Sequence, residues 1–180
     1  MKTVFNIIWV FFIFSSNLFG QETDSTKMNT LMVYGDDFLF KVKEPDNWIG
    51  DIDNAAKYYS NIVFYKSIDD LNNGGALIQV LVFKKQDENT IEDLKYDLVN
   101  YKKKYKDLKI KDIQITHKDY QCFSKVVLMN GKFTQYISYI NPGEEYKNGF
   151  SVSMNIQKRE ANINELDAFK KIIESLQMIK

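Results

Sequence analysis

Three consecutive runs of strand-forming residues near the C-terminal half constrain this chain most. The runs read FSKVVLM, KFTQYISYI and GFSVSMNIQ, and only the turn segments Asn130-Gly131 and Asn141-Pro142-Gly143 interrupt them. An Asn-Gly pair between β-branched and aromatic runs is a strong hairpin signal, because a two-residue type I′ turn needs positive φ at both central positions. The segment therefore predicts a three-stranded antiparallel meander, against which the rest of the chain must pack.

Earlier strands are predicted in residues 38–42, 61–65 and 76–83. In the first of them Phe40 alternates with Lys41, as expected of a half-buried strand. The run 76–83 is apolar on both faces, which predicts a central strand with cover on both sides. We expect these strands to join the meander in one sheet.

A further strand is predicted just before the meander, where Ile113, Ile115 and His117 share one face. A short helix is predicted over residues 53–59, close to the tryptophan that follows Pro45 and that we expect to cover one end of the core.

Apolar residues that recur every three or four positions predict two longer amphipathic helices. Thr90 with Asp93 resembles a capping box at the start of the first helix, and Asn162 with Glu165 does so for the last one. The apolar face of the first helix comprises Ile91, Leu94, Leu98, Tyr101 and Tyr105. The apolar face of the last one comprises Ile163, Leu166, Phe169, Ile172, Ile173, Leu176 and Ile179. Both faces must be buried, so we expect these helices to lie on the sheet.

The order of elements, with hairpins dominating and helices on the faces, indicates the α+β class. We expect an antiparallel β-sheet of about six to seven strands flanked by helices. One domain over residues 36–180 accounts for all of the elements, and the sequence contains no internal repeat.

A resemblance to a known family rests on four features of this chain. They are the strand that enters a Pro-x-x-Trp turn (FKVKEPDNW), the VFYK strand after the short helix, the sheet, and the C-terminal helix. Over about residues 36–180 the chain resembles the PsbP-like superfamily. The resemblance implies a sheet with helices on both sides. It also implies a family of mainly non-enzymatic accessory and binding proteins, among them photosystem oxygen-evolving subunits and a Ran-binding import factor. No motif of either activity matches this chain residue by residue, so the resemblance implies neither partner.

Residues 1–20 have the pattern of a secretory signal peptide. Lys2 supplies a positive charge, residues 4–14 form an apolar run, and a more polar stretch ends at Gly20. The apolar run is short for a transmembrane helix, which needs about 20 apolar residues. We therefore predict cleavage near Gly20/Gln21, a linker over residues 21–35, and an exported protein that is periplasmic or extracellular.

The charge balance argues against a nucleic-acid partner. The chain has 24 basic and 24 acidic side chains, so removal of Lys2 leaves 23 against 24 and a net charge of −1. A protein without a basic surplus has no global attraction for a polyanion such as nucleic acid.

His117 and Cys122, the single histidine and the single cysteine, suggest an enzymatic alternative. A hydrolase-like enzyme would use His117 with nearby acids or with Cys122, which follows five residues later. However, a lone cysteine is commonly a small buried hydrophobe, whereas a nucleophile needs a thiolate in an open pocket. We expect both residues to be structural, and we predict no catalytic residue, cofactor or metal site.

Acidic pairs in predicted turns do not change this expectation. None of them has the spacing of a calcium-binding loop, so we interpret them as solvated turns. They are Asp36-Asp37, Asp51 with Asp53, Asp69-Asp70 and Glu144-Glu145.

The sharpest local charge asymmetry is the run KKKYKDLKIK, which holds six lysines and one acid. Lys102, Lys103, Lys104 and Lys106 are therefore candidates for contact with an anionic surface, such as lipid head groups or surface glycans. The simpler interpretation is that they form the solvent-facing side of the helix and the following turn, and we favour it. Peripheral membrane contact is the less favoured interpretation.

The last strand of the meander has one wholly polar face, formed by Ser151, Ser153, Asn155 and Gln157. Such a face can receive a ligand or a partner, but solvent-exposed faces are common in antiparallel sheets, and we favour that interpretation.

These observations favour a non-enzymatic, exported accessory or binding module of the cell envelope, with an unknown protein or cell-surface partner. The hydrolase-like enzyme described above is one alternative. A structural envelope component, which would self-assemble, is another.

Overall fold

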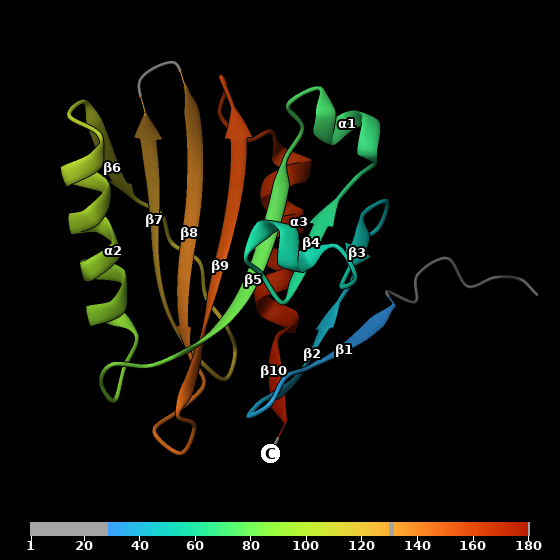
Figure 1. Cartoon of the computed structure of the whole chain (residues 1–180), viewed down its shortest axis with the longest axis vertical. Helices are drawn as coiled ribbons and strands as arrows, with labels where there is room; N and C mark the ends of the chain where they lie inside the picture. Colours follow the sequence, from blue (N-terminus) through green and yellow to red (C-terminus); the bar gives the residue numbers. More distant parts are fainter. Residues whose placement is uncertain (1–28, 130–131, 180) are drawn as a thin grey trace, which may run out of the picture.

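The computed structural model describes residues 29–129 and 132–179, so the predicted signal peptide lies outside the described residues. Within these ranges the chain forms a seven-stranded and a three-stranded antiparallel sheet, three α-helices and one 3-10 helix (Figure 1). The α+β class predicted from the sequence is confirmed. No helix in the described ranges is long and apolar enough to cross a membrane.

The large sheet has the strand order β3-β4-β5-β9-β8-β7-β6. Its strands are β3 (Ile49–Asp51), β4 (Ile62–Tyr65), β5 (Leu77–Lys84), β6 (Leu108–Asp112), β7 (Gln121–Met129), β8 (Phe133–Asn141) and β9 (Asn148–Gln157). The predicted meander is β7-β8-β9. Strand β5 pairs with β9 along its whole length, from Leu77 opposite Asn155 to Lys84 opposite Asn148.

The hairpin between β7 and β8 differs from the prediction in its register. Met129 pairs with Phe133, so three residues separate the paired positions where the Asn-Gly signal predicted two. Residues 130 and 131 themselves lie outside the described ranges. In the next turn the Asn141 side chain accepts a hydrogen bond from the backbone N–H of Gly143, whose φ of 131° favours glycine.

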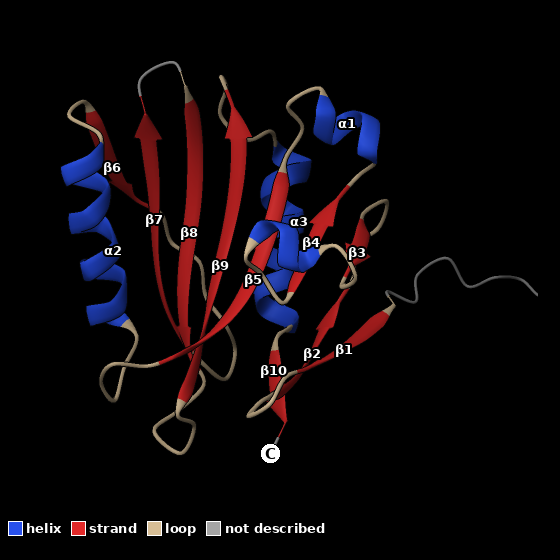
Figure 2. Cartoon of the chain, in the orientation of Figure 1, coloured by secondary structure: helices blue, strands red, loops and turns tan. Residues whose placement is uncertain are grey.

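One face of the large sheet is covered by α3 (Ile163–Ser175) and by the small sheet, as Figure 2 shows. The Phe169 ring of α3 meets Tyr136 of β8 edge-on, with 6.3 Å between the ring centroids. Phe40 of the small sheet meets Phe150 of β9 edge-on at 5.3 Å. Burial of each such phenylalanine contributes about 2 kcal/mol, so this layer is the main core.

The small sheet corrects two predictions. Its order is β1-β2-β10, with β1 (Thr30–Tyr34), β2 (Leu39–Lys43) and β10 (Gln177–Ile179). The strand predicted over 38–42 therefore does not join the large sheet, and residues 30–34, predicted as the end of the linker, form β1. The sequence TLMVY has no clear period, and β2 becomes a strand of a second sheet only because β1 and β10 flank it.

The last helix ends earlier than the apolar stripe predicted. The Ser175 hydroxyl accepts a hydrogen bond from Lys43 N–H and donates one to the Ile172 carbonyl, both at 2.9 Å. These bonds end the helix against β2. Leu176 of the stripe is fully buried just after the helix, but Ile179 belongs to β10.

The opposite face of the large sheet carries separate covers at its two sides. Helix α2 (Ile91–Lys104) buries Leu94 against Val127, Ile137 and Tyr139 of β7 and β8. At the other side lie η1 (Ala55–Tyr58), which matches the predicted short helix, and α1 (Ile68–Asn72), which the sequence analysis missed.

Strand β5 lies centrally in the sheet, but its cover is less complete than its apolar sequence predicted. Ile78 and Val80 are fully buried on the α3 side. On the other side Leu77 is buried beneath the η1 cover, whereas Leu81 remains 39% exposed.

The strand predicted around Ile113, Ile115 and His117 lies elsewhere. The structure places β6 at residues 108–112, and residues 113–117 have no strand pairing. Ile115 and His117 are nevertheless buried, so the apolar pattern correctly predicted burial but not the conformation.

The two predicted capping boxes have different outcomes. At α3 the Asn162 side chain accepts from Glu165 N–H, and the Glu165 carboxylate accepts from Asn162 N–H, as predicted. At α2 the Thr90 side chain makes no capping bond, and Asn89 Oδ1 accepts from Ile91 N–H instead. The Thr90 hydroxyl is buried without a partner among the described residues.

Replacing Asn162 with Ala should lower the free energy of unfolding by about 1 kcal/mol, because the helix loses its cap. Thr90→Val is the contrasting variant. It should be neutral or stabilising, because valine has nearly the same shape and leaves no buried hydroxyl unpaired. Urea unfolding monitored by circular dichroism measures both changes. A loss in Thr90→Val as large as that in Asn162→Ala would show that the hydroxyl has a partner.

Candidate functional site

His117 is fully occupied by structural hydrogen bonds. Its Nδ1 accepts from the backbone N–H groups of Asp119 and Tyr120 at 3.0 and 3.1 Å, so the proton lies on Nε2. Nε2 donates to the Leu176 carbonyl at 3.0 Å, and the ring stacks on Tyr120. The imidazole thus ties the segment before β7 to the end of α3, and neither nitrogen is free for proton transfer.

Cys122 is not an activated nucleophile. Its side chain is half-buried on β7 and lies against the main core, and burial raises the pKa of the thiol to about 11. A thiolate of this kind is scarce near neutral pH. No hydrogen bond joins Cys122 to His117 in the part of the chain that the structure describes.

The lysines that were candidates for contact with an anionic surface lie at the end of α2 and just after it. Lys102, Lys103, Lys104 and Lys106 are all exposed, as a solvent-facing helix side requires. Two of them, Lys104 and Lys106, also line a cavity of about 170 Å³ together with Lys132 of the β7–β8 turn. The run of lysines therefore lies next to a second group of basic residues, which the sequence pattern did not indicate.

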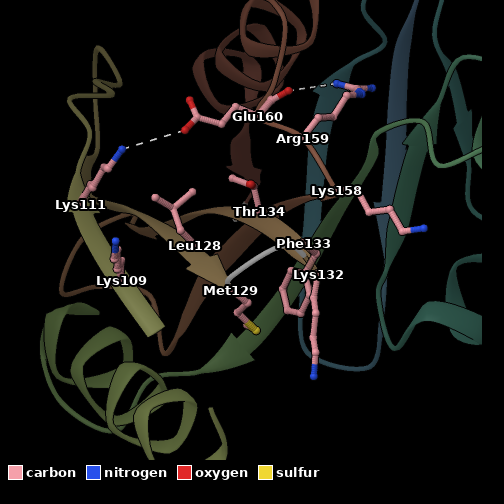
Figure 3. Close-up of a pocket in the computed structure, with 10 residues that line it drawn as sticks. All are labelled: Lys109, Lys111, Leu128, Met129, Lys132, Phe133, Thr134, Lys158, Arg159 and Glu160. Atoms are coloured by element: carbon pink, nitrogen blue, oxygen red, sulfur yellow. Dashed lines mark hydrogen bonds and ion pairs between the residues drawn. The ribbon is translucent and has the colours of Figure 1, made fainter. Parts of the chain in front are cut away.

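That feature is a cavity of about 330 Å³ beside the β7–β8 turn, which we call the basic pocket (Figure 3). Its lining residues are Lys109, Lys111, Leu128, Met129, Lys132, Phe133, Thr134, Lys158, Arg159 and Glu160. Edge strand β6 supplies one wall, the segment between β9 and α3 supplies the other, and β7 and β8 supply the floor.

The register of β6 and β7 explains why lysines line this wall. Lys109 is paired with Leu128, and Lys111 is paired with Val126, which contacts the main core. Both lysines therefore project on the α3 side of the sheet, at an edge strand where long charged side chains also discourage pairing with another chain.

The opposite wall depends on a strained residue. Lys158 has a φ of 57°, in the left-handed region that side chains other than glycine rarely adopt. Its N–H donates to the Lys132 carbonyl at 3.2 Å, which brings the two lysines to the same rim. In Figure 3 both side chains extend outward from the pocket's opening.

Acids neutralise only part of this positive charge. Glu160 faces Lys111 with 4.0 Å between the charged groups, and Arg159 makes two bonds of 2.7 Å to the buried carboxylate of Glu165. Burial alone would raise the pKa of Glu165, but the bonds from Arg159 and from Asn162 N–H outweigh it and lower that pKa. The guanidinium group of Arg159 is thus already paired with an acid of α3.

Three lysines of the pocket, Lys109, Lys132 and Lys158, have no acidic partner within the described ranges. These exposed lysines line a cavity whose floor contains Leu128 and Thr134. The arrangement can therefore bind an anionic group of a size that fits between β6 and the β9–α3 segment.

The other predicted features do not form a site. Across residues 29–129 and 132–179, no three histidine, cysteine or acidic side chains come together as metal ligands would. The polar face of β9 exists, but Asn155 already donates to Gln79 Oε1 at 2.5 Å. Ser151, on the same face, bonds to the Tyr139 hydroxyl, which also donates to Asp97.

Comparison with known proteins rests on structure alone, since the sequence matches no family model and no curated protein. The Ran-binding protein Mog1p of Saccharomyces cerevisiae superposes with a TM-score of 0.51 at 11% identity, over 84% of this chain and 96% of its own. LpqN, involved in cell envelope biogenesis of Mycobacterium tuberculosis, gives 0.51 at 14% identity over 85% and 92%. The chain has the PsbP-like fold.

A cyanobacterial PsbP from Synechocystis gives a TM-score of 0.49 at 12% identity, over 89% of this chain and 99% of its own. The matches to Mog1p and LpqN confirm the fold that the PsbP-like resemblance in the sequence implied. At these identities the similarity carries no residue of the basic pocket from one protein to another.

Alkylation of Cys122 tests its assignment as a structural residue. With a pKa of about 11, its reaction with iodoacetamide should be slow at pH 7 and rise roughly tenfold for each pH unit up to pH 10. Mass spectrometry of the labelled protein gives the rate, and the urea-unfolded chain gives the reference. A folded protein that reacts at pH 7 as fast as the unfolded chain would restore the enzymatic alternative.

Proposed function

We propose that this protein is a non-enzymatic, exported accessory module that binds an anionic group of its partner in the basic pocket. The observation that carries the proposal is the set of unpaired lysines, Lys109, Lys132 and Lys158, around one cavity. Like charges that gather without acids repel one another, and an anion that binds between them removes this repulsion. A phosphate, sulfate or carboxylate group has the required charge.

The strain at Lys158 supports a functional role for this rim. Glycine adopts a φ of 57° at little cost, whereas a lysine there costs about 1 kcal/mol or more. Residues held in sparsely populated conformations cluster at functional sites. The lysine thus occupies a position where glycine would fit the backbone better.

The non-enzymatic part of the proposal draws on His117 and Cys122, whose imidazole and thiol serve the fold. The exported part draws on the signal-like pattern of residues 1–20. The involvement of the structurally similar LpqN in cell envelope biogenesis agrees with such a location.

Titration with inorganic tripolyphosphate tests the pocket as an anion site. The doubly substituted variant Lys109→Gln/Lys132→Gln should bind it at least about tenfold more weakly than the unchanged protein, because two charge-assisted contacts are lost. Lys102→Gln/Lys103→Gln is the matched control, with the same charge change on α2 and no lining residue. Isothermal titration calorimetry at low salt measures both. Equal weakening in the two variants would show a diffuse charge effect and contradict a built site.

Lys158→Gly separates the pocket from fold stability. This variant should unfold at a higher urea concentration, with a gain of up to about 1 kcal/mol, because the left-handed strain disappears. It should also bind tripolyphosphate more weakly than the unchanged protein. Tyr59→Gly, which relieves the same left-handed strain at an exposed residue that does not line the pocket, should leave anion binding unchanged. Unaltered binding in Lys158→Gly would remove this residue from the proposed site.

A further inference from the structure

The outer face of the small sheet is a second surface that the proposed function does not use. Val33, Phe40, Val42 and Met178 of this sheet are buried in the main core, so the residues that alternate with them point away from α3. The register assembles these outward residues from β1, β2 and β10. They are Thr30, Met32, Tyr34, Leu39, Lys41, Lys43, Gln177 and Ile179.

This outer face is divided into an apolar end and a basic end. At the apolar end Tyr34 is paired with Leu39, which is also paired with Ile179. Tyr34 is 83% exposed and the neighbouring Met32 is 48% exposed. Within the described ranges, no helix covers these side chains.

The basic end surrounds a cavity of about 450 Å³. Lys41, Lys43, Lys118 and Lys171 line it, and Glu174 is the one acid among its lining residues. Lys118 and Lys171 have weak, exposed ion pairs with acids outside the cavity, at 3.5 and 3.8 Å. No acid pairs with Lys41 or Lys43 in the part of the chain that the structure describes.

We propose that this outer face rests on the surface of a bilayer that contains anionic phospholipid. Lysines at one end match the phosphates of the head groups, and each contributes to binding near such a surface. The exposed tyrosine and methionine at the other end match the interfacial layer, where amphipathic aromatic side chains are enriched. A soluble acidic partner would satisfy the lysines but would not explain why an exposed apolar end lies beside them.

The position of β1 in the chain agrees with this orientation. The apolar run of residues 4–14 precedes β1, and only residues 15–29 lie between them. Until the predicted cleavage near Gly20, only these residues separate the small sheet from the apolar run. In Figure 1 β10 lies at the bottom of the molecule, whereas the C-terminal end of β7, which lines the basic pocket, lies at the top.

Co-sedimentation of the exported protein with vesicles tests this proposal. Vesicles of phosphatidylcholine alone should bind little protein, whereas vesicles that also contain phosphatidylglycerol should bind it, and raised salt should release it. Lys41→Gln/Lys43→Gln should weaken binding to the mixed vesicles by about tenfold or more. Met32→Ser/Tyr34→Ser should weaken it too, and Lys118→Gln/Lys171→Gln provides an independent test of the basic end.

The matched control is Lys102→Gln/Lys103→Gln, which changes the charge equally on α2, lines neither cavity and should leave vesicle binding unchanged. All substituted side chains except Lys41 are exposed, and equal melting temperatures confirm that each variant is folded. Equal binding to both kinds of vesicle, or binding that only the control variant loses, would overturn the proposal. The vesicle assay tests residues around the small sheet, whereas the tripolyphosphate titration tests residues of the basic pocket, so either proposal can fail without the other.

Discussion

The pairing of β5 with β9 is the interaction on which the rest of this structure depends. It joins the N-terminal strands to the meander across a long stretch of chain, and closing so long a loop costs entropy that the contacts must exceed. Ile78 lies opposite Met154 and Val80 opposite Val152, and all four side chains are fully buried. Helix α3 packs on this buried strip, and the small sheet packs beside it. Each further layer therefore needs this pair of strands in register.

The parts of the fold that could be predicted are those whose signal is local. The meander, the α3 capping box and most of the apolar faces of α2 and α3 follow from residues close together in sequence. Ile163, predicted as part of the α3 face, is 70% exposed. Strands β1, β3 and β10 could not be predicted, because three to five residues carry too little periodicity. Each of them is a strand only because another strand provides backbone partners. In β10, for example, Met178 pairs with Phe40 of β2. The same effect moved residues 38–42 from the large sheet to the small one.

The candidate site was visible in the sequence only in part. The run of lysines is obvious in the sequence, and its pattern predicts the solvent-facing side of one helix. The structure instead distributes these lysines over the end of α2, the segment after it and the edge strand β6. Lys132 and Lys158 stand far apart in sequence, and they meet because β8 pairs with β9 and because Lys158 adopts a left-handed conformation. Neither the tertiary pairing nor the sign of φ at a lysine can be read from residue types. The basic pocket is thus a product of topology.

A chain with no net charge can still present strongly charged surfaces if its charges are segregated. One lysine, Lys85, is placed among acceptors, where its ammonium group donates to Glu88 O, Asn141 Oδ1 and Gly143 O at 2.8 to 3.1 Å. Among the described residues, no acid pairs with Lys109, Lys132 and Lys158 of the basic pocket or with Lys41 and Lys43 of the small sheet. At physiological ionic strength a charge acts over about 8 Å, so each lysine-lined surface attracts only what comes close to it. A chain without net charge thus presents two separate basic surfaces, and the charge of each acts only locally.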